Sequence, residues 1–246
     1  MLLSFDNVAK TFPNGTLALD RVSFTVAAGE FISLVGPSGC GKSTALRLIA
    51  GLTEPSSGSV TWVGKRPSLG FVFQDAALMP WATVAKNVRL PLDLARSDES
   101  TADARVKDTL ELVGLTKFAN VYPRELSGGM RMRVSIARAL AMDASVLLMD
   151  EPFAALDELT RDRLNDELRE LWAAKNLTII FVTHSVYESV YLSSRIIALS
   201  PRPGRVIADI AMAEPKSRSA DFRMTQLYGE RCREVRAALQ REGAPS

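Results

Sequence analysis

The sequence contains few cysteines and histidines, and it has no long apolar run. Its 246 residues include two cysteines and one histidine. Two cysteines cannot build a disulfide framework, so this composition favours a reducing compartment. Apolar runs such as residues 31–35 are of strand length, far below the ~18–20 residues that a membrane span needs. The first ten residues carry no secretory pattern. We therefore expect neither a membrane-spanning nor a secreted protein.

An excess of one charge sign is also missing. The chain has 30 basic and 28 acidic residues, which gives a formal net charge of +2. Such a balance argues against a protein built mainly to coat nucleic acid. Apolar residues make up 47% of the chain and charged residues 24%, as in ordinary globular proteins. The length fits one large α/β domain or two small ones.

Short apolar runs alternate with longer helical patterns along most of the chain. The runs at 31–35, 146–149 and 177–182 are apolar on both faces, which is typical of parallel strands covered by helices. Helical patterns occupy residues 43–52, 102–113, 129–142 and 159–174. We therefore predict an α/β fold with a mainly parallel sheet flanked by helices, and ligands at the carboxyl ends of its strands.

Two regions depart from this alternation. Short strand patterns at 3–8, 21–26, 58–63 and 70–73 predict a small antiparallel sheet near the N-terminus. Residues 75–128 are mostly helical, with interruptions at Pro80, Pro91 and Pro123, and we predict an inserted helical subdomain there. The expected domains are 1–215, which contains these parts, and a basic helical tail, 216–246.

A glycine-rich loop follows the first parallel strand. It fits the pattern G-x-x-x-x-G-K-[ST] between a strand and a helix, in which backbone N–H groups cradle phosphate oxygens. Lys42 is expected to contact the β- and γ-phosphates, and the Ser43 hydroxyl to hold Mg²⁺. The alternative is a glycine-rich turn with a surface lysine. The candidate binding residues are Gly36, Pro37, Ser38, Gly39, Cys40, Gly41, Lys42, Ser43 and Thr44.

An acid pair ends the second parallel strand. Asp150 is expected to bind Mg²⁺ directly or through water. Glu151 leaves the strand in another direction and is expected to orient or deprotonate a water that attacks the γ-phosphate. The alternative is a helix cap followed by an acidic first-turn residue.

The segment Leu126-Ser-Gly-Gly-Met130 precedes an arginine-rich helix. Ser127 is expected to cap this helix, and Gly128 and Gly129 to expose its first N–H groups to an anion. Together with the phosphate loop and the acid pair, this segment resembles the signature of the ABC ATPases, over residues 3–205. Met130 departs from the glutamine that is common in importer ATPases.

The resemblance implies roles for further residues. Gln74 resembles the family's Q-loop glutamine, which contacts Mg²⁺ and the attacking water. His184, the one histidine, matches the switch histidine that contacts the γ-phosphate, although a lone strand-end histidine is more often structural. Phe12 lies where the family stacks an aromatic, commonly tyrosine, on adenine; without the family it is an ordinary core aromatic. Residues 155–157 resemble the D-loop.

The resemblance also implies a function and partners. ABC ATPases hydrolyse ATP with Mg²⁺ as dimers that enclose two ATP molecules, so we expect a second copy of this chain, a transmembrane permease and, indirectly, a solute-binding protein. Residues 74–81 and 199–205 are similar to importer ATPases for nitrate, aliphatic sulfonates, taurine and related solutes. We expect a peripheral protein at the cytoplasmic face of the membrane, with no nucleic-acid partner.

Two rival functions stay open. A soluble ABC ATPase acting on nucleic acid or ribosomes generally carries coiled coils or tandem cassettes, neither of which occurs here. A regulatory subunit without turnover does not need Gln74, Glu151 and His184 together.

The basic tail allows two interpretations. Residues 216–241 hold seven basic and three acidic side chains. They suit a solvated amphipathic helix packed by Leu227, Val235 and Leu239. The alternative is attraction to anionic lipid.

Overall fold

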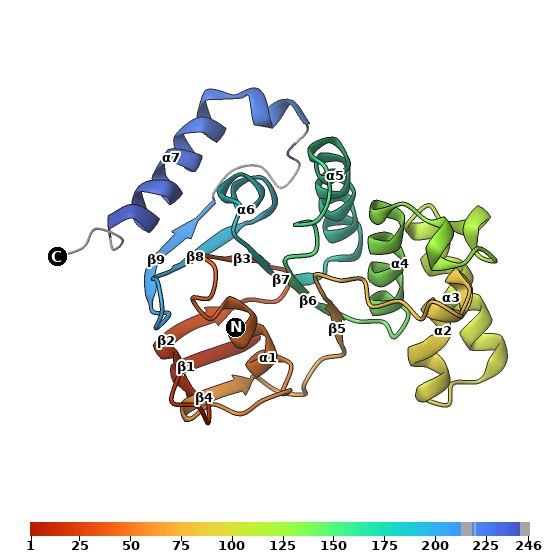
Figure 1. Ribbon diagram of the computed structural model, residues 1–246, viewed down its shortest axis with the longest axis horizontal. Coiled ribbons are helices and arrows are strands. Elements are labelled where there is room, and N and C mark those ends of the chain that lie inside the picture. Colours follow the sequence, from red (N-terminus) through yellow and green to blue (C-terminus); the bar gives the residue numbers. More distant parts are fainter. Residues whose placement is uncertain (213–217, 219, 242–246) are drawn as a thin grey trace. The chain divides into compact units, whose positions relative to one another are not determined.

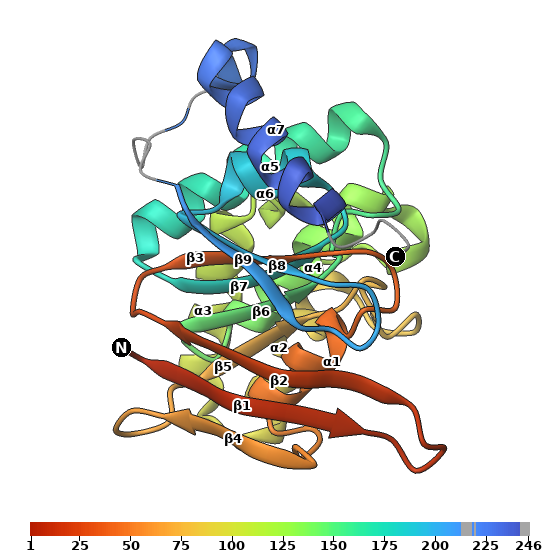
Figure 2. The same ribbon diagram turned by 90° about the vertical axis from the view of Figure 1, so that its left-hand side faces the viewer.

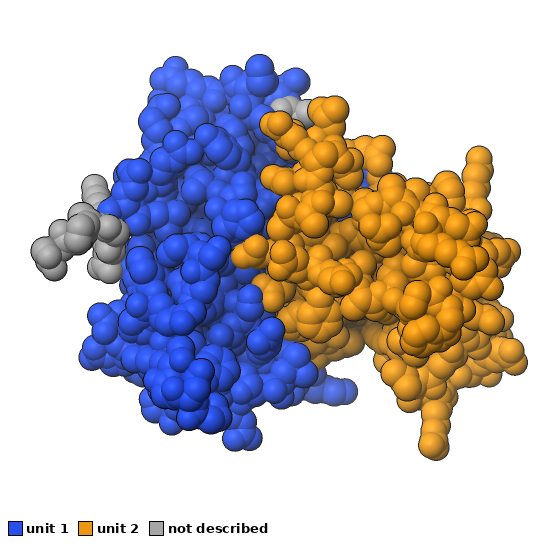
Figure 3. All heavy atoms as spheres, in the orientation of Figure 1, with its two compact units in different colours: residues 1–66, 165–246 blue, residues 67–164 orange. Residues whose placement is uncertain are grey.

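The computed structural model describes residues 1–212, 218 and 220–241. The chain divides into two compact units, residues 1–66 with 165–246 (unit 1) and residues 67–164 (unit 2), which are coloured separately in Figure 3. Both units combine helices with strands (Figure 1), as the alternating sequence pattern predicts. In the described residues, no helix combines the length and the apolar character that crossing a membrane requires.

Unit 1 contains the predicted antiparallel sheet. Strands β1 (Leu3–Thr11), β2 (Leu17–Val26) and β4 (Ser57–Trp62) lie in the order β2-β1-β4 (Figure 2). Alternate side chains of β1 and β2 are buried, and the rings of Phe5 and Phe24 stack at 4.7 Å between centroids. This alternation gives the sheet one core face and one solvent face, as antiparallel sheets allow.

A second group of strands in unit 1 forms the base of the candidate site. Strand β3 (Phe31–Val35) pairs in parallel with both β7 (Thr178–Thr183) and β8 (Arg195–Leu199), and β9 (Val206–Ala211) adds an antiparallel edge. Every residue of β3 and β7 is buried, which explains why the sequence shows continuous apolar runs there. Helix α1 (Lys42–Ile49) follows β3, and α6 (Val186–Leu192) follows β7.

One strand prediction is wrong in its pairing. The run 70–73, assigned from sequence to the antiparallel sheet, corresponds to β5 (Leu69–Val72), which pairs in parallel with β6 (Val146–Asp150) in unit 2. Gly70 fits this pairing, since a Cβ there would lie 2.7 Å from Leu147 Cδ2 and 2.8 Å from the Ala139 carbonyl oxygen. Only glycine lets β5 approach so closely.

The helical part of unit 2 has its own core. It comprises α2 (Val84–Leu94), α3 (Glu99–Leu112) and α4 (Gly128–Leu140), with short 3₁₀ turns at Thr116–Phe118 and Pro123–Glu125. Buried side chains from all three helices, such as Val88, Leu110 and Val134, form one cluster. The predicted subdomain 75–128 therefore lies within unit 2 and packs with α4. Pro91 does not interrupt the helix as predicted: it lies inside α2, three residues before its end, and the helix continues to Leu94 with one backbone donor fewer.

The last elements are α5 (Glu158–Lys175), the 3₁₀ turn Ala220–Met224 and α7 (Gln226–Arg241). Helix α7 packs on α6, β8 and β9 through buried Tyr228, Cys232 and Val235. Of the predicted packing residues, Val235 is fully buried and Leu239 half-buried, but Leu227 is 41% exposed. The predicted boundary at 215/216, Lys216 included, lies outside the described residues.

Candidate functional site

The glycine-rich loop connects β3 to α1, in the setting that the sequence predicts. Pro37, Ser38 and Gly39 are exposed at its tip. Gly41 caps α1 with φ of 107°, and a Cβ there would lie 2.6 Å from Leu19 Cδ2. A side chain at position 41 would therefore be both strained and crowded. The loop turns sharply into the helix N-terminus, where free N–H groups and the helix dipole favour anions.

Side chains within the loop point mostly inward. Lys42 is only 4% exposed, and its Nζ donates hydrogen bonds to the carbonyl oxygens of Gly36 at 2.8 Å and Pro37 at 3.0 Å. Cys40 is 1% exposed and Thr44 is buried, while Ser43 is half-buried. The Lys42 ammonium thus lies beneath the exposed tip, where it adds positive charge to the N–H groups of the loop.

His184 lies beside the start of this loop. Because Val35 pairs with Thr183 in the parallel β3–β7 ladder, the next residues, Gly36 and His184, leave adjacent strand ends. The turn is held by the Thr183 hydroxyl, which accepts from the Ser185 N–H at 2.9 Å, and by the Ser185 hydroxyl, which caps α6. His184 is exposed. Unit 1 therefore brings the predicted switch histidine to the same edge as the phosphate loop.

Phe12 follows the end of β1, in the hairpin turn toward β2. Its backbone exchanges hydrogen bonds with Thr16 and Gly15 at 2.9 Å. The ring is half-buried, and the Lys10 ammonium lies 5.7 Å from its centroid. Phe12 is not part of the buried core, so the reading as an ordinary core aromatic is wrong, and its ring has surface available for stacking.

Unit 2 brings together Gln74 and the acid pair. Strands β5 and β6 run in parallel with Val72 opposite Met149, so Gln74 and Glu151 each lie two residues beyond this pair. Gln74 is exposed, while Asp150 and Glu151 are half-buried. Glu151 has φ of 47°, which is unusual for a residue with a side chain and turns it away from the strand direction. Such backbone conformations cluster at functional sites.

The signature segment forms the start of α4. The Ser127 hydroxyl caps the helix and accepts from the Met130 N–H at 3.2 Å. Ser127 is exposed, whereas Gly129 is buried, and a Cβ at position 129 would lie 2.7 Å from Thr160 Cγ2. Met130, the departure from the family pattern, is half-buried and lies against the helical core. The capping prediction is confirmed; Gly128 and Gly129, which carry the first N–H groups of α4, are half-buried and buried.

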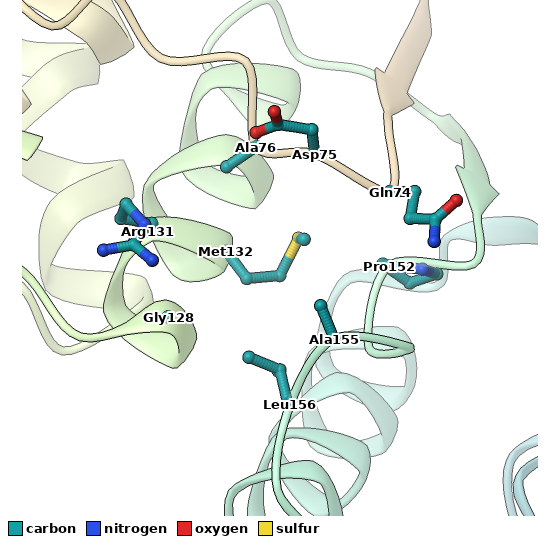
Figure 4. A pocket seen from close by; sticks show the side chains of 9 residues that line it. All are labelled: Gln74, Asp75, Ala76, Gly128, Arg131, Met132, Pro152, Ala155 and Leu156. Atoms are coloured by element: carbon teal, nitrogen blue, oxygen red, sulfur yellow. The ribbon is translucent and has the colours of Figure 1, made fainter.

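A pocket of about 420 Å³ connects these parts of unit 2. Gln74 and Pro152 lie on one side of it, Gly128 and Arg131 on the other, and Met132 points between them (Figure 4). Its remaining lining residues are Asp75, Ala76, Ala155 and Leu156. The pocket thus adjoins the residue after the acid pair, the Q-loop glutamine and the start of the D-loop.

Arg138 is a residue of this region that sequence reasoning did not select. Its guanidinium donates to the carbonyl oxygens of Ala76 and Ala77, both at 2.8 Å, and so fastens α4 to the segment after Gln74. Burial lowers the pKa of Arg138 from its usual value. Its partners are backbone oxygens more than sixty residues away, so no sequence motif reveals them.

Oxygen donors suited to Mg²⁺ are present in both units. Ser43 supplies a hydroxyl, Gln74 an amide oxygen and Asp150 a carboxylate, and hard oxygen ligands are those that Mg²⁺ prefers. Among the described residues, no cluster of three or more His, Cys, Asp or Glu side chains forms a metal site on its own. This suits an ion held by few protein ligands together with substrate phosphates.

The order of these features along the chain matches one sequence family, described as ABC transporter, over residues 19–154. The chain belongs to the ABC transporter family. It is an ATP-hydrolysing subunit with the P-loop fold of that family. The resemblance inferred from the motifs is therefore confirmed.

Relatives of this ABC ATPase include the aliphatic sulfonates import ATP-binding protein SsuB of Bacillus cereus. The two are 42% identical over 231 residues, which cover 90% of this chain and 91% of the relative. The SsuB protein of Bacillus anthracis is 45% identical over 214 residues, 84% of each chain. Among solved structures, the ATP-binding cassette MJ0796, a dimer bound to ADP and Pi, has a TM-score of 0.75 at 33% identity, covering 87% of this chain and all of that one.

A second solved structure is CbiO1 from Clostridium perfringens, part of the ABC transporter complex CbiONQ. Its TM-score is 0.80 at 26% identity, with 98% of this chain and 97% of that chain covered. The similarity therefore includes the C-terminal part of the ABC ATPase, beyond the family match.

Proposed function

We propose that this ABC ATPase is the energy-coupling subunit of an importer for a small solute of the nitrate, sulfonate or taurine class. The observation that carries this proposal is the similarity to aliphatic sulfonates import ATP-binding proteins over 84–91% of both chains. All predicted catalytic side chains accompany it, which argues against a regulatory subunit without turnover. No comparison favours the alternative of an ATPase acting on nucleic acid or ribosomes.

The chemistry follows from the two groups of residues. In unit 1, the N–H groups of the phosphate loop and Lys42 bind the β- and γ-phosphates, Phe12 stacks on adenine, and His184 contacts the γ-phosphate. In unit 2, Gln74 positions the attacking water and Glu151 accepts its proton. Ser43, Gln74 and Asp150 would hold Mg²⁺, which neutralises charge on the phosphate oxygens when bound.

We further propose that two copies enclose two ATP molecules. The exposed Ser127 and the first N–H groups of α4 offer a second anion-binding surface. In a dimer like that of the MJ0796 cassette, Ser127, Gly128 and Gly129 of one copy would face the phosphate loop of the other. ATP would then bind the closed state better than the open one, and hydrolysis would release it.

The helical part of unit 2 is the proposed docking region for the permease, at the cytoplasmic face of the membrane. Trp81 and Leu94 are each 77% exposed there, which is unusual for large apolar side chains. Leu94 also lines a mostly apolar pocket of about 220 Å³ with Leu90 and Pro91. A solute-binding protein would act indirectly, by delivering the solute to that permease.

Reconstitution tests this function. The ATPase is co-expressed with the permease and binding protein encoded beside it, and ATP-driven uptake of labelled taurine, alkanesulfonate and nitrate is measured in vesicles. We expect uptake of one of these solutes with wild type and none with Glu151→Gln. Wild-type ATP hydrolysis with no assembly on a permease, and with stimulation by nucleic acid or ribosomes, would instead establish the alternative.

A further inference from the structure

The connection between β8 and β9, residues 200–205, runs against the phosphate loop. Although 163 residues separate the two partners, Arg202 Nε donates a hydrogen bond to the Gly39 carbonyl oxygen at 3.0 Å. A Cβ at Gly39 would lie only 2.9 Å from Nη2 of the same guanidinium. The guanidinium therefore occupies the space that a side chain at position 39 would need.

The backbone of this connection also approaches the loop closely. A Cβ at Gly204 would lie 2.1 Å from the Cys40 carbonyl oxygen, so no other residue fits there without a shift. The Gly204 N–H donates to the Ala18 carbonyl oxygen at 2.9 Å, and its own carbonyl oxygen accepts from the Asp20 N–H at 3.0 Å. The connection is thus fixed between the start of β2 and the phosphate loop.

Side chains hold the turn that carries Arg202. The Arg205 guanidinium pairs with the Asp20 carboxylate at 2.6 and 2.9 Å. The Ser200 hydroxyl accepts from the Arg205 N–H at 3.0 Å and donates to the Pro203 carbonyl oxygen at 2.9 Å. Because the turn is held at both ends, little backbone freedom is lost when Arg202 bonds to the loop.

The bond to Gly39 acts on the neighbouring donor. The Gly39 carbonyl and the Cys40 N–H belong to one planar peptide and point in opposite directions. Gly39 has φ of 76°, and the Cys40 N–H lies at a long 3.3 Å from the Pro37 carbonyl oxygen. A charged donor on the carbonyl fixes this peptide plane and polarises its N–H. The Cys40 N–H, which donates this long hydrogen bond to Pro37 within the loop, is thereby held in one orientation, and a phosphate oxygen would replace Pro37 as its acceptor.

We propose that Arg202 is a positioning residue of the phosphate loop, which orients the Gly39–Cys40 peptide so that the Cys40 N–H meets a phosphate oxygen beyond the α-phosphate. The proposal rests on the proposed function, namely that this loop binds ATP. The proposal gives a structural role to residues 199–205. From the sequence alone, this segment is known only to be similar to one branch of importer ATPases. The side chain is exposed, so its replacement does not open a cavity.

The test compares Arg202→Ala and Arg202→Lys with Arg47→Ala, which removes an exposed charge at the far end of α1. The bond at risk in the bound state is the one from the Cys40 N–H to the charged phosphate oxygen, and loss of one such charge-assisted hydrogen bond corresponds to about ten-fold in affinity. We therefore expect Arg202→Ala to raise the Kd for ATP and ADP, and the KM for ATP, about ten-fold, with AMP affinity and kcat retained. Arg202→Lys restores part of the affinity, and Arg47→Ala changes none of these values.

Each other outcome has a separate meaning. If Arg202→Ala binds ATP like wild type while Lys42→Ala does not, the positioning role is wrong and the ATP site stands. If ATP, ADP and AMP all weaken equally with a lower Tm, Arg202 only supports the fold and the proposal is overturned. If wild type itself binds no ATP, the proposed function fails first, independently of Arg202.

Discussion

The two units place their candidate residues in different surroundings. Unit 1 buries much of its phosphate loop, with Lys42 and Cys40 at 4% and 1% exposure. Unit 2 leaves Gln74 and Ser127 exposed and holds Glu151 in a left-handed backbone conformation. Polar groups that are buried need internal partners, and Lys42 has two loop carbonyls. The proposed phosphate-binding part is therefore preorganised, whereas the side chains proposed for hydrolysis are more open to solvent.

The difference indicates a division of labour. A preorganised loop loses little entropy when it binds phosphates, which favours affinity. Exposed groups can change partners as ATP is bound and hydrolysed, which favours coupling to another subunit. Substitutions in unit 1 should thus change ATP binding, and substitutions in unit 2 should change turnover.

Glu151→Gln is the sharpest test of the hydrolytic unit. Removing a general base lowers turnover by about 10²–10⁴-fold, so we expect kcat to fall by that amount while the Kd for ATP stays unchanged. ATP should also trap a dimer, which size-exclusion chromatography with light scattering detects. Glu111→Gln, an exposed substitution on α3, is the matched control. Normal turnover in Glu151→Gln would show that another group accepts the proton.

Lys42→Ala tests the binding unit. A hydrogen bond to a charged group contributes about 1.5–3 kcal/mol, so we expect the Kd for ATP to rise by about 10–100-fold. Isothermal titration measures this change, with the exposed Lys65→Ala of unit 1 as control. Affinity equal to wild type would mean that backbone N–H groups alone bind the phosphates, and the two units would then differ less than proposed.

Much of the fold was predictable where local pattern and burial agree. The run 31–35 coincides with β3, because a strand buried on both faces must be apolar throughout. The ends of helices were less predictable. The pattern predicts a helix over residues 43–52, but α1 stops at Ile49, shortly before Gly51 with φ of 69°. The parallel pairing of β5 could not be predicted, since it depends on Ala139 and Leu147, far away in sequence.

The motif residues of the candidate site could be predicted from the sequence, but the arginines that hold its backbone in place could not. Motif residues such as Lys42 and Ser127 carry their signal within a few positions of the chain. Arg138 and Arg202 bond to backbone oxygens at separations of 61 and 163 residues. Every residue has a backbone carbonyl, so the residue type of the acceptor does not reveal that an arginine will bond to it.

The smallest predicted effect is on the pH dependence of Tm, in variants of one acidic residue from each unit. The pKa of Asp157 in unit 2 is lowered mainly by the Thr160 N–H, and that of Asp20 in unit 1 mainly by Arg205. A carboxylate whose pKa is lowered in the folded protein stabilises the fold above its unfolded pKa, and this contribution is lost as pH falls through the folded pKa. Both Asp157→Asn and Asp20→Asn should therefore flatten the loss of Tm below about pH 4.

The salt dependence of Tm distinguishes the interactions of Asp20 and Asp157, because added ions screen an exposed ion pair more strongly than a hydrogen bond to a neutral N–H. In melting curves at pH 7, raising the salt concentration should reduce the Tm difference between wild type and Asp20→Asn. Asp157 precedes α5 and caps it by accepting from the Thr160 N–H at 3.0 Å. The difference for Asp157→Asn should change less, because asparagine also caps helices well and the Thr160 N–H is uncharged. Equal salt dependence for both variants would mean that Asp157 stabilises the fold through charges, as Asp20 does, and not through its cap.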